Sequence, residues 1–266
     1  MDDAGRPPGG FRTDISHPAR VYDYWLGGKD NFEADRAMAE RLIDAIPGAV
    51  GSARDNRVFL RQAVRFAVGA GVTQFIDIGS GLPTAENTHE IALRVNPACR
   101  VVYVDNDPVV RVHGQALLAS TGSTVVVQAD LRDPEAILKH PEVNGLIDFD
   151  RPVGLLLLGV LHFLSDEESH AVLDRLRLAL VPGSVLAVSH LTPDSDPEGM
   201  RRFVDVATTP PDAPAVIPRT RSEIEGFFAG FDLVDPGVAA VHLWRPTRPG
   251  REHDPFWLWA GVGIAR

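Results

Sequence analysis

A chain of 266 residues with 44% hydrophobic residues is long enough for one large α/β domain or two small ones. Its net charge of −10 disfavours a surface that follows the phosphates of a nucleic acid. Cys99 is the only cysteine, which excludes an intramolecular disulfide and any cysteine-rich metal site.

The segments that could target the chain to a membrane or bind a metal are also missing from the sequence. The N-terminus lacks the apolar core of a signal peptide, and the longest apolar run, Val153 to Leu164, is too short to span a bilayer. Histidines and carboxylates are scattered without metal-ligand spacing. We therefore expect a soluble cytoplasmic protein with no metal and no membrane partner.

The N-terminal quarter predicts a disordered tail and a helical cap. Residues 1–15 are polar and rich in glycine and proline, and we expect them to be disordered. Three helices should follow: one capped by Ser16 that stops at Gly27-Gly28, one over 32–46, and one that begins with a capping box, Ser52 to Asp55. Residues 16–71 would form the cap of a single domain, and residues 72–266 its core.

In the core, short apolar strands alternate with helices. The strands are expected at QFIDI, RVVYVD, TVVVQAD, PVGLLLLGV and SVLAVSHL. Unbroken apolar strands of this kind are typical of a parallel sheet covered on both faces. The last two apolar runs, DLVDPGVAAVHLW and FWLWAGVGI, are joined by a loop of proline, arginine and glycine and predict an antiparallel hairpin. The fold class is therefore α/β.

The first strand of the core runs directly into a glycine turn, QFIDIGSGLPT, and then into a predicted helix. This is the layout of a nucleotide-binding βα crossover. Gly79 lets the chain turn sharply, and Gly81 lets a ligand lie close to the main chain. Thr84 stands where the third glycine of a dinucleotide fingerprint would be, so the turn alone leaves a purely structural role open.

Three further strand ends carry residues suited to a nucleotide, and ligands of open parallel sheets bind outside these ends. Asp105 follows the second strand, where a carboxylate can accept from both hydroxyls of a ribose. Asp130, after the third, can accept from an adenine amino group while Leu131 packs on the ring. Gly159 ends the fourth strand. Each carboxylate alone could be a capping or turn residue, but together these ends favour one nucleotide pocket.

Four segments together resemble the class I S-adenosylmethionine-dependent methyltransferases: FIDIGSGLPT, VVYVDNDP, QADLRDP and LVPGSVLAVS. The blocks ARVYDYWLGGKDNF and FIDIGSGLPTAENTHE resemble more closely an S-adenosyl methyltransferase family abundant in actinobacteria, over nearly the whole chain from about Ile15. The resemblance implies a Rossmann-like, mostly parallel sheet of seven strands and S-adenosylmethionine as cofactor. The missing third glycine fits, because this cofactor has no pyrophosphate to bind.

The resemblance also implies roles for individual residues. The methionine part of the cofactor would be held by four residues of the first strand and its turn: Asp77, Gly79, Ser80 and Gly81. Asp105 would bind the ribose hydroxyls and Asn106 would lie along the adenine, whose site Asp130 and Leu131 would complete. The backbone at Gly159 would approach the methionine amino group.

The implied reaction is displacement of the methyl group by an oxygen, nitrogen, sulfur or carbon nucleophile, for which the protein mainly aligns the two reactants. A base is needed only if the nucleophile must lose a proton. His162 is the first candidate for this catalytic role and His190 the second, and for both a hydrogen-bonded core or rim histidine is the alternative. The fourth strand lacks the Asn/Asp-Pro-Pro-aromatic motif of enzymes that methylate DNA bases. With the acidic charge, this favours a small-molecule acceptor over nucleic acid, while a protein acceptor and the oligomeric state stay open.

Two regions are candidates for the acceptor site. Around the turn at Gly27-Gly28 we expect a substrate-binding cluster of Arg20, Tyr24, Lys29 and Asp30. This turn would cover the cofactor or line the acceptor pocket, with a plain helix–helix turn as the alternative. Residues 192–221 are a long polar stretch with several prolines and a candidate acceptor-side loop. Two other functions stay open: a sensor or partner protein that binds the cofactor without turnover, and a nicotinamide-dependent oxidoreductase, which the glycine pattern disfavours.

Overall fold

The computed structural model describes residues 12–83, 86–118, 122–211, 213–246 and 255–266. The predicted disorder of the tail falls mostly on residues 1–11, outside this described part of the chain. Within it, no helix is both long and apolar enough to cross a membrane.

Three helices precede the first strand, as predicted: α1 (Pro18–Trp25), α2 (Glu33–Ala45) and α3 (Ala49–Gly69). Two of their starts differ from the prediction. The cap of α1 is His17 rather than Ser16, because its Nδ1 accepts from the backbone N–H of Ala19 at 3.3 Å. The predicted capping box at Ser52 is wrong, because burial of Ala49 favours a helix that starts one turn earlier, and the N–H of Ser52 already donates to Gly48 O.

The sheet confirms the predicted α/β class with an antiparallel C-terminal part. Its strands are β1 (Gln74–Ile78), β2 (Arg100–Asp105), β3 (Thr124–Gln128), β4 (Gly154–Leu158), β5 (Val185–Leu191), β6 (Phe231–Leu233), β7 (Ala239–Ala240) and β8 (Leu258–Ala265). Their order is β3-β2-β1-β4-β5-β8-β6, with β7 also paired to β8. Strands β1 to β5 are parallel, whereas β8 is antiparallel to β5, β6 and β7. The first arm of the predicted hairpin is split into β6 and β7 at Pro236, which has no N–H to donate to a ladder.

The strand order reverses at β1, which pairs with β2 on one side and with β4 on the other. In an open parallel sheet this is the place where a crevice opens outside the carboxyl ends of the strands. The predicted strand ends at Gly79, Asp105 and Gly159 therefore lie around one switch point.

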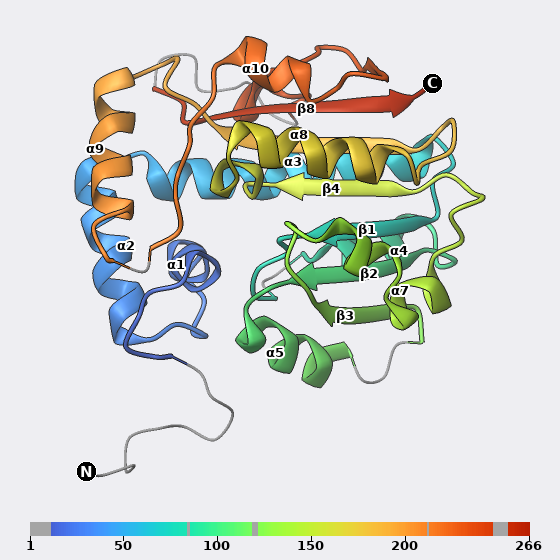
Figure 1. Cartoon of the computed structure of the whole chain (residues 1–266), viewed down its shortest axis with the longest axis horizontal. Helices are drawn as coiled ribbons and strands as arrows, with labels where there is room; N and C mark the ends of the chain where they lie inside the picture. The colour runs from blue at the N-terminus through green and yellow to red at the C-terminus, as the bar shows by residue number, and fades with distance from the viewer. Residues whose placement is uncertain (1–11, 84–85, 119–121, 212, 247–254) are drawn as a thin grey trace.

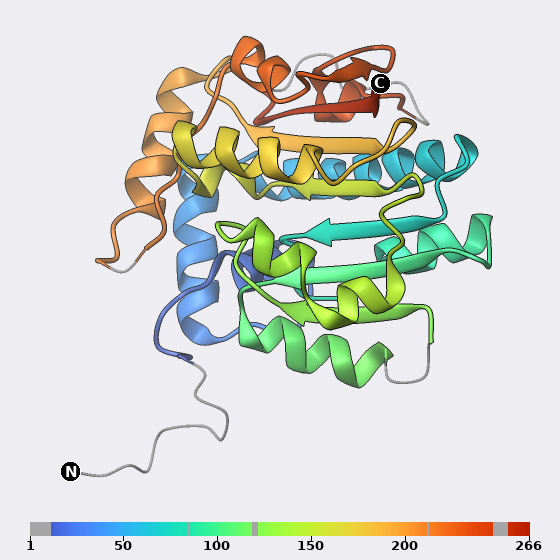
Figure 2. The ribbon, with the colours of Figure 1, turned by 45° about the vertical axis from the view of Figure 1, so that its right-hand side comes forward.

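Helices cover both faces of the sheet (Figures 1 and 2). Those of the core are α4 (Thr88–Val95), α5 (Pro108–Leu118), α6 (Pro134–Leu138), α7 (Pro141–Leu146), α8 (Asp166–Arg177), α9 (Pro197–Ala207) and α10 (Arg221–Gly226), with 3₁₀ turns η1 (Leu161–Phe163) and η2 (Val241–Leu243). Alternate strand residues face opposite layers: Phe75 packs in the core with α3 and α4, and Ile76 in the core with α6 and α8. The predicted helix start at Thr84 lies outside the described residues.

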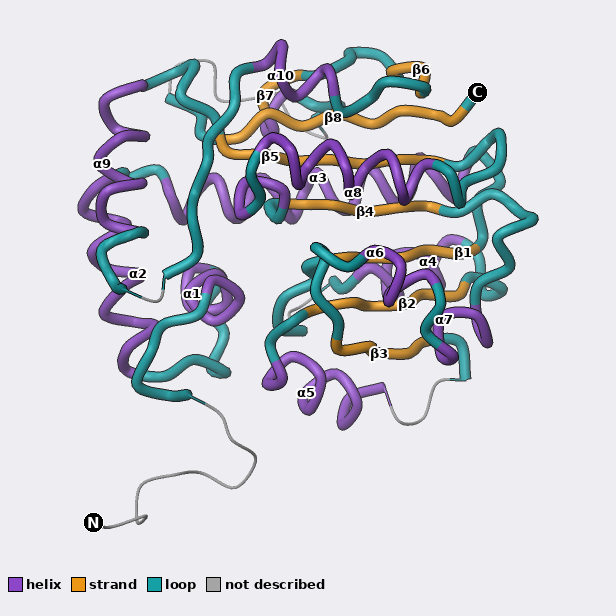
Figure 3. Tube along the Cα trace, in the orientation of Figure 1, coloured by secondary structure: helices purple, strands orange, loops and turns teal. Residues whose placement is uncertain are grey.

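Helices α1, α2 and α9 lie beyond the carboxyl ends of the parallel strands, at the left of Figures 1 and 3. Helix α9 comes from the predicted acceptor-side loop and packs on the cap. The rings of Trp25 and Phe203 are 6.5 Å apart, and Arg41 on α2 donates to Thr209 Oγ1 at 3.4 Å. The two regions that the sequence suggested for the acceptor thus meet at the edge of the sheet where the nucleotide motifs end.

Candidate functional site

The glycine turn after β1 is bound to the end of β2. The N–H groups of Gly79 and Ser80 both donate to Val104 O, at 2.8 and 3.3 Å. Gly79 and Gly81 have φ values of +71° and +65°, which favour glycine. A Cβ on Gly79 would lie 2.6 Å from Val160 Cγ2, whereas a Cβ on Gly81 would have no atom within 4 Å. Gly79 is therefore required for close packing against the loop after β4, and Gly81 faces open space that a ligand can enter.

Asp77, in the middle of the switch point, is almost completely buried. It accepts a hydrogen bond from Thr88 Oγ1 at 2.6 Å, at the start of α4. Burial raises the pKa of Asp77 to about 6, and the Thr88 hydrogen bond and the charge of Arg57 oppose the shift only in part. Near neutral pH this carboxylate is thus ionised but poorly solvated, so a cationic group beside it would be stabilised.

Asp105 joins the glycine turn to the next loop. Its Oδ2 accepts from the N–H of Gly81 at 2.8 Å and its Oδ1 from the N–H of Asp107 at 2.9 Å. Burial raises the pKa of Asp105, and these two backbone hydrogen bonds oppose the shift. A carboxylate has about four lone-pair sites, so two remain for further donors. Asp105 can therefore accept from both hydroxyls of a ribose, as the resemblance implies.

The predicted adenine residues lie beside Asp105 at the same edge. Strands β2 and β3 are in parallel register with Asp105 opposite Gln128, so the loop that follows β3 starts next to this carboxylate. In that loop Leu131 is buried, while Asp130 is exposed and accepts from the backbone N–H two residues further along at 2.8 Å. Asn106 is exposed. The structure thus brings the four residues to neighbouring strand ends, and their contacts with adenine stay a prediction.

Arg20 connects the cap to the loop after β2. Its Nε lies 3.3 Å from Asp107 Oδ2, and its guanidinium lies 3.5 Å from Asp35 Oδ2. His17 Nδ1 is 3.2 Å from the same oxygen of Asp107. All three charged side chains are buried, with 5% of Arg20, 3% of Asp107 and none of Asp35 exposed. Arg20 therefore fixes the cap against the loop that presents Asp105, although its predicted role in substrate binding stays untested.

The other three residues predicted to bind substrate do not converge on one pocket. Tyr24 donates from its hydroxyl to the Glu40 carboxylate on α2. Asp30 lies 3.3 Å from His113 Nδ1 on α5, and Lys29 is exposed. The side chains on the two sides of the Gly27-Gly28 turn thus contact α2 and α5, and a substrate role for these residues stays a prediction.

The end of β4 has a different character from the end of β2. Gly159, with φ +67°, donates its N–H to Ser189 O at 2.9 Å. A Cβ at this position would lie 3.8 Å from Asn56 Nδ2 and 4.0 Å from His162 Cε1. Only 6% of Asn56 and 7% of His162 are exposed, yet Asn56 Oδ1 and His162 Nδ1 have no hydrogen-bond partner. Ser80 Oγ, in the glycine turn, is also buried without a hydrogen-bond partner.

The two candidate histidines differ in whether both of their ring nitrogens have hydrogen-bond partners. Both ring nitrogens of His190 have a hydrogen-bond partner. Arg219, which can only donate, lies 2.9 Å from His190 Nε2, so Nε2 accepts. The hydrogen is therefore on Nδ1, which donates to Leu191 O at 2.8 Å. Burial lowers the pKa of His190 to about 3. Burial, followed by the neighbouring His190 and Arg219, also lowers the pKa of His162 well below its usual value, so both imidazoles are neutral at pH 7. His162, unlike His190, keeps a free ring nitrogen.

Asn56 and its neighbour Tyr22 were not predicted from the sequence as site residues. The Tyr22 hydroxyl donates to Ala53 O at 3.0 Å and accepts from Asn56 Nδ2 at 3.2 Å. One signal was available: Asn56 shares the buried face of α3 with Phe59 and Leu60, and an amide in an apolar stripe calls for a polar partner.

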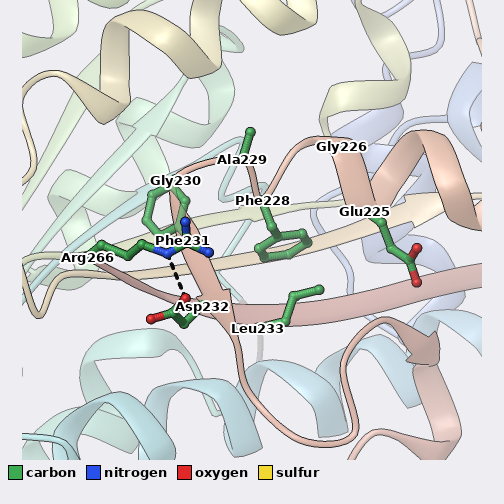
Figure 4. A pocket seen from close by; sticks show the side chains of 9 residues that line it. All are labelled: Glu225, Gly226, Phe228, Ala229, Gly230, Phe231, Asp232, Leu233 and Arg266. Atoms are coloured by element: carbon green, nitrogen blue, oxygen red, sulfur yellow. Dashed lines mark hydrogen bonds and ion pairs between the residues drawn. The ribbon is translucent and has the colours of Figure 1, made fainter.

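A hollow lies at the opposite edge of the sheet, between the end of α10, strand β6 and Arg266, and has a volume of about 510 Å³ (Figure 4). Because β8 is antiparallel to β5, its last residues lie beside the amino ends of the parallel strands. This hollow is therefore remote from the glycine turn. Over the described ranges, no group of three or more histidine, cysteine and acidic residues could hold a metal ion.

Comparisons with known proteins agree with this geometry. The family model of the S-adenosyl methyltransferases matches residues 7–266. The chain is 46% identical to a proposed methyltransferase from Thermobifida fusca YX, with 98% of each chain covered and a TM-score of 0.92. It is 38% identical to a DUF574 family protein from Streptomyces avermitilis, with 96% of this chain and 99% of that one covered and a TM-score of 0.90.

A more distant structure shows the fold alone. The N-methyltransferase NodS from Bradyrhizobium japonicum, solved with S-adenosyl-L-homocysteine, is 12% identical, with 86% of this chain and 97% of that one covered and a TM-score of 0.51. No curated protein matches the chain. The family match over almost the whole length decides the assignment: the chain belongs to the S-adenosyl methyltransferase family, whose cofactor is S-adenosylmethionine.

Proposed function

We propose that the protein is a methyltransferase that transfers the methyl group of S-adenosylmethionine to a small-molecule acceptor bound between the cap and the end of β4. The environment of His162 supports turnover of a methyl acceptor rather than binding of the cofactor alone. His162 is buried, its Nδ1 has no partner, and its Cε1 lies 4.0 Å from the position that a Cβ on Gly159 would take. A buried histidine with a purely structural role is expected to have partners for both ring nitrogens, as His190 has.

The residues at the strand ends fit the cofactor. Asp105 would bind the ribose hydroxyls with its two remaining lone-pair sites, and the open space at Gly81 would admit the ligand next to the main chain. The ionised, poorly solvated Asp77 would favour the ammonium group of the methionine part. When bound, S-adenosylmethionine supplies a methyl group that its sulfonium already activates, so the protein has only to align the acceptor and exclude water.

In this proposal, His162 is the catalytic residue that takes a proton from the acceptor. A neutral imidazole is needed for this, and burial keeps His162 neutral at pH 7. His190 is not a second base, because both of its ring nitrogens are bound, and it holds Arg219 in place below the loop after β4. Arg219 in turn donates to Leu161 O and Leu164 O, on either side of His162, at 3.2 and 2.9 Å.

The experiment is incubation of the purified protein with methyl-labelled S-adenosylmethionine and a metabolite extract, followed by isolation of the labelled product. We expect label in one or a few small molecules, and loss of about 100-fold or more of the transfer rate in His162→Gln. S-adenosylhomocysteine should bind this variant as it binds the wild type. His170→Gln, which changes an exposed histidine on α8, is the matched control.

Two results would count against the proposal. Tight binding of S-adenosylmethionine without transfer to any acceptor, small molecule or protein, would instead favour a sensor or partner protein. Full turnover by His162→Gln would remove this residue from the mechanism and leave the methyltransferase assignment in place.

A further inference from the structure

Helices α1 and α7 begin with the same pair of residues, a histidine followed by a proline. The caps are His17 and His140. In both helices the ring Nδ1 accepts from the backbone N–H two residues further along, at 3.3 Å in α1 and at 3.2 Å in α7. An imidazole differs from the usual cap residues in that it can take up a proton near neutral pH. The two caps therefore share one local geometry and can be compared directly.

The Nδ1 of His17 also faces a buried carboxylate. It lies 3.2 Å from Asp107 Oδ2, in the loop after β2. The other oxygen of Asp107 accepts from the N–H of Val109 at 2.9 Å, whereas Oδ2 has no hydrogen-bond partner although it is buried. Arg20 Nε lies 3.3 Å from Oδ2 and has no hydrogen-bond partner either. Asp107 Oδ2 therefore lacks a donor, and His17 Nδ1 is close enough to supply one.

The protonation of His17 Nδ1 decides which of its two neighbours it can bind. Without a hydrogen, Nδ1 accepts from the N–H of Ala19 and turns a lone pair toward Asp107 Oδ2. With a hydrogen, it donates to Asp107 Oδ2 and no longer caps the helix. The neutral ring can carry its one hydrogen on either nitrogen, whereas the imidazolium always carries one on Nδ1. Protonation therefore exchanges a long helix-cap bond for a hydrogen bond to a buried charge.

The loop that His17 faces is the one that presents Asp105. The N–H of Asp107 donates to Asp105 Oδ1 at 2.9 Å, so a displacement of Asp107 moves this carboxylate. Burial raises the pKa of Asp105, and the charge of His17 opposes the shift together with the backbone hydrogen bonds. The other charged groups around His17 are Arg20 and Asp35, which lie 3.5 Å apart, and Asp35 Oδ1 accepts from the N–H of His17 at 2.8 Å. His17 thus brings to this cluster a charge that changes near neutral pH.

We propose that His17 is a positioning residue for the cofactor: in its protonated form it donates to Asp107 Oδ2 and holds the loop that presents Asp105 to the ribose. The inference rests on the proposed function, in which Asp105 binds the ribose hydroxyls, and it does not depend on the catalytic role of His162. A loop that is already held in place loses less conformational freedom when the ligand binds. Cofactor binding should therefore gain from His17 at acid pH and not at alkaline pH.

The test is calorimetry with S-adenosylhomocysteine between pH 5.5 and 8, on the wild type and on His17→Asn. Asparagine is a good helix cap, so the variant keeps the start of α1 and removes the titrating group. We expect the variant to bind within about twofold of the wild type at pH 8 and about three- to tenfold more weakly at pH 5.5. Asp77 and the pair of His113 with Asp30 are present in both proteins, so their titration cancels in the ratio of the two dissociation constants.

His140→Asn is the matched control. It replaces the same kind of cap on α7, whose last residue contacts the first residue of β2, at the edge of the sheet opposite Asp105. Its dissociation constant should equal that of the wild type at every pH. Asp107→Asn is a second variant in case His17→Asn fails to fold. It removes the charge that His17 faces and keeps an oxygen for the N–H of Val109, so its ratio to the wild type should again increase toward pH 5.5.

The outcomes separate this inference from the proposed function. A ratio that is constant from pH 5.5 to 8 would overturn the inference and leave the methyltransferase assignment in place, because a purely structural cap changes affinity equally at every pH. A ratio that increases toward alkaline pH would overturn it as well, since neutral His17 would then hold the loop. Absence of methyl transfer to any acceptor would contradict the proposed function, and the binding ratio would still decide on His17. A wild-type protein that does not bind S-adenosylhomocysteine at any pH would contradict both.

Discussion

The ends of β2 and β4 lie on two sides of the same switch point and differ in how their polar groups are satisfied. At the end of β2, Asp105 already accepts two backbone hydrogen bonds, and Asp107 lies against Arg20 of the cap. At the end of β4, Asn56 Oδ1 and His162 Nδ1 have no partner. The carboxylates at the end of β2 already have hydrogen-bond or ion-pair partners within the protein, whereas these two atoms at the end of β4 have none.

This difference distinguishes residues that hold the site in shape from residues whose polar atoms have no partner within the protein. At the end of β2, side chains hold the backbone and each other in position, so a substitution there should act first on stability and on cofactor binding. At the end of β4, Asn56 Oδ1 and His162 Nδ1 do not stabilise the ligand-free protein, because burying a polar atom without a partner costs free energy. Substitutions there should impair the binding or methylation of the methyl acceptor and leave the free energy of unfolding nearly unchanged.

The strongest test of this comparison is Arg20→Met. The change leaves the carboxylates of Asp35 and Asp107 buried without their positive partner. Breaking a buried ion pair from one side costs about 3–5 kcal/mol, so we expect the free energy of unfolding in urea to fall by about this amount. Arg36→Met, at an exposed position on α2, is the control and should change it by less than about 1 kcal/mol. A small loss in Arg20→Met would show that the end of β2 is not held by the cap.

A smaller effect with a clear pH dependence is expected for Asp77→Asn. Asp77 has a pKa of about 6 in the folded protein against 3.8 in its ordinary state, so the folded state disfavours its charge. The cost of burying that charge is present above pH 6, decreases as the pH falls through 6, and is absent below 3.8. The variant should therefore be more stable than the wild type at pH 7, by about 1–3 kcal/mol, and equal to it near pH 4.

Thermal unfolding of both proteins between pH 4 and 8 measures this difference. Asparagine keeps an oxygen for the Thr88 hydroxyl, so the comparison isolates the charge. A variant that is less stable at every pH would show that Asp77 is stabilised by a partner rather than strained by burial. If the Asp77 charge also serves the cofactor, the more stable variant should bind S-adenosylmethionine less tightly.

Local patterns were sufficient for the strands and their ends, because these features depend on a few neighbouring residues. The apolar run of β1 with Gly79 and Gly81, and Asp105 at the end of β2, fix both the backbone and its place in a parallel sheet. The start of α3 could not be obtained in this way. The burial of Ala49 against the core decides it, and burial depends on the tertiary structure.

The acceptor side was harder to predict for the same reason. The partners of Arg20 are separated from it in sequence, so its position between Asp35 and Asp107 follows only from the packing of α1 on α2 and on the loop after β2. Asn56 and His162 likewise come from distant segments, and both lie near Gly159 only because α3 packs against β4. His162 could be named as a candidate from the sequence because its place after a strand end is a local feature, and its catalytic role stays a prediction.

The smallest effect is expected for Arg266→Ala, which lies outside both ends of the comparison. Arg266 Nε contacts Asp232 Oδ1 at 2.7 Å beside the hollow of Figure 4, and about two thirds of each side chain is exposed. An exposed ion pair contributes at most about 1 kcal/mol, so the free energy of unfolding should hardly change. Because this hollow is at the amino edge of the parallel strands, the dissociation constant of S-adenosylhomocysteine in calorimetry should equal that of the wild type. A clear loss of affinity would mean that the two edges of the sheet are coupled, and the contrast between β2 and β4 would then be only part of what controls ligand binding.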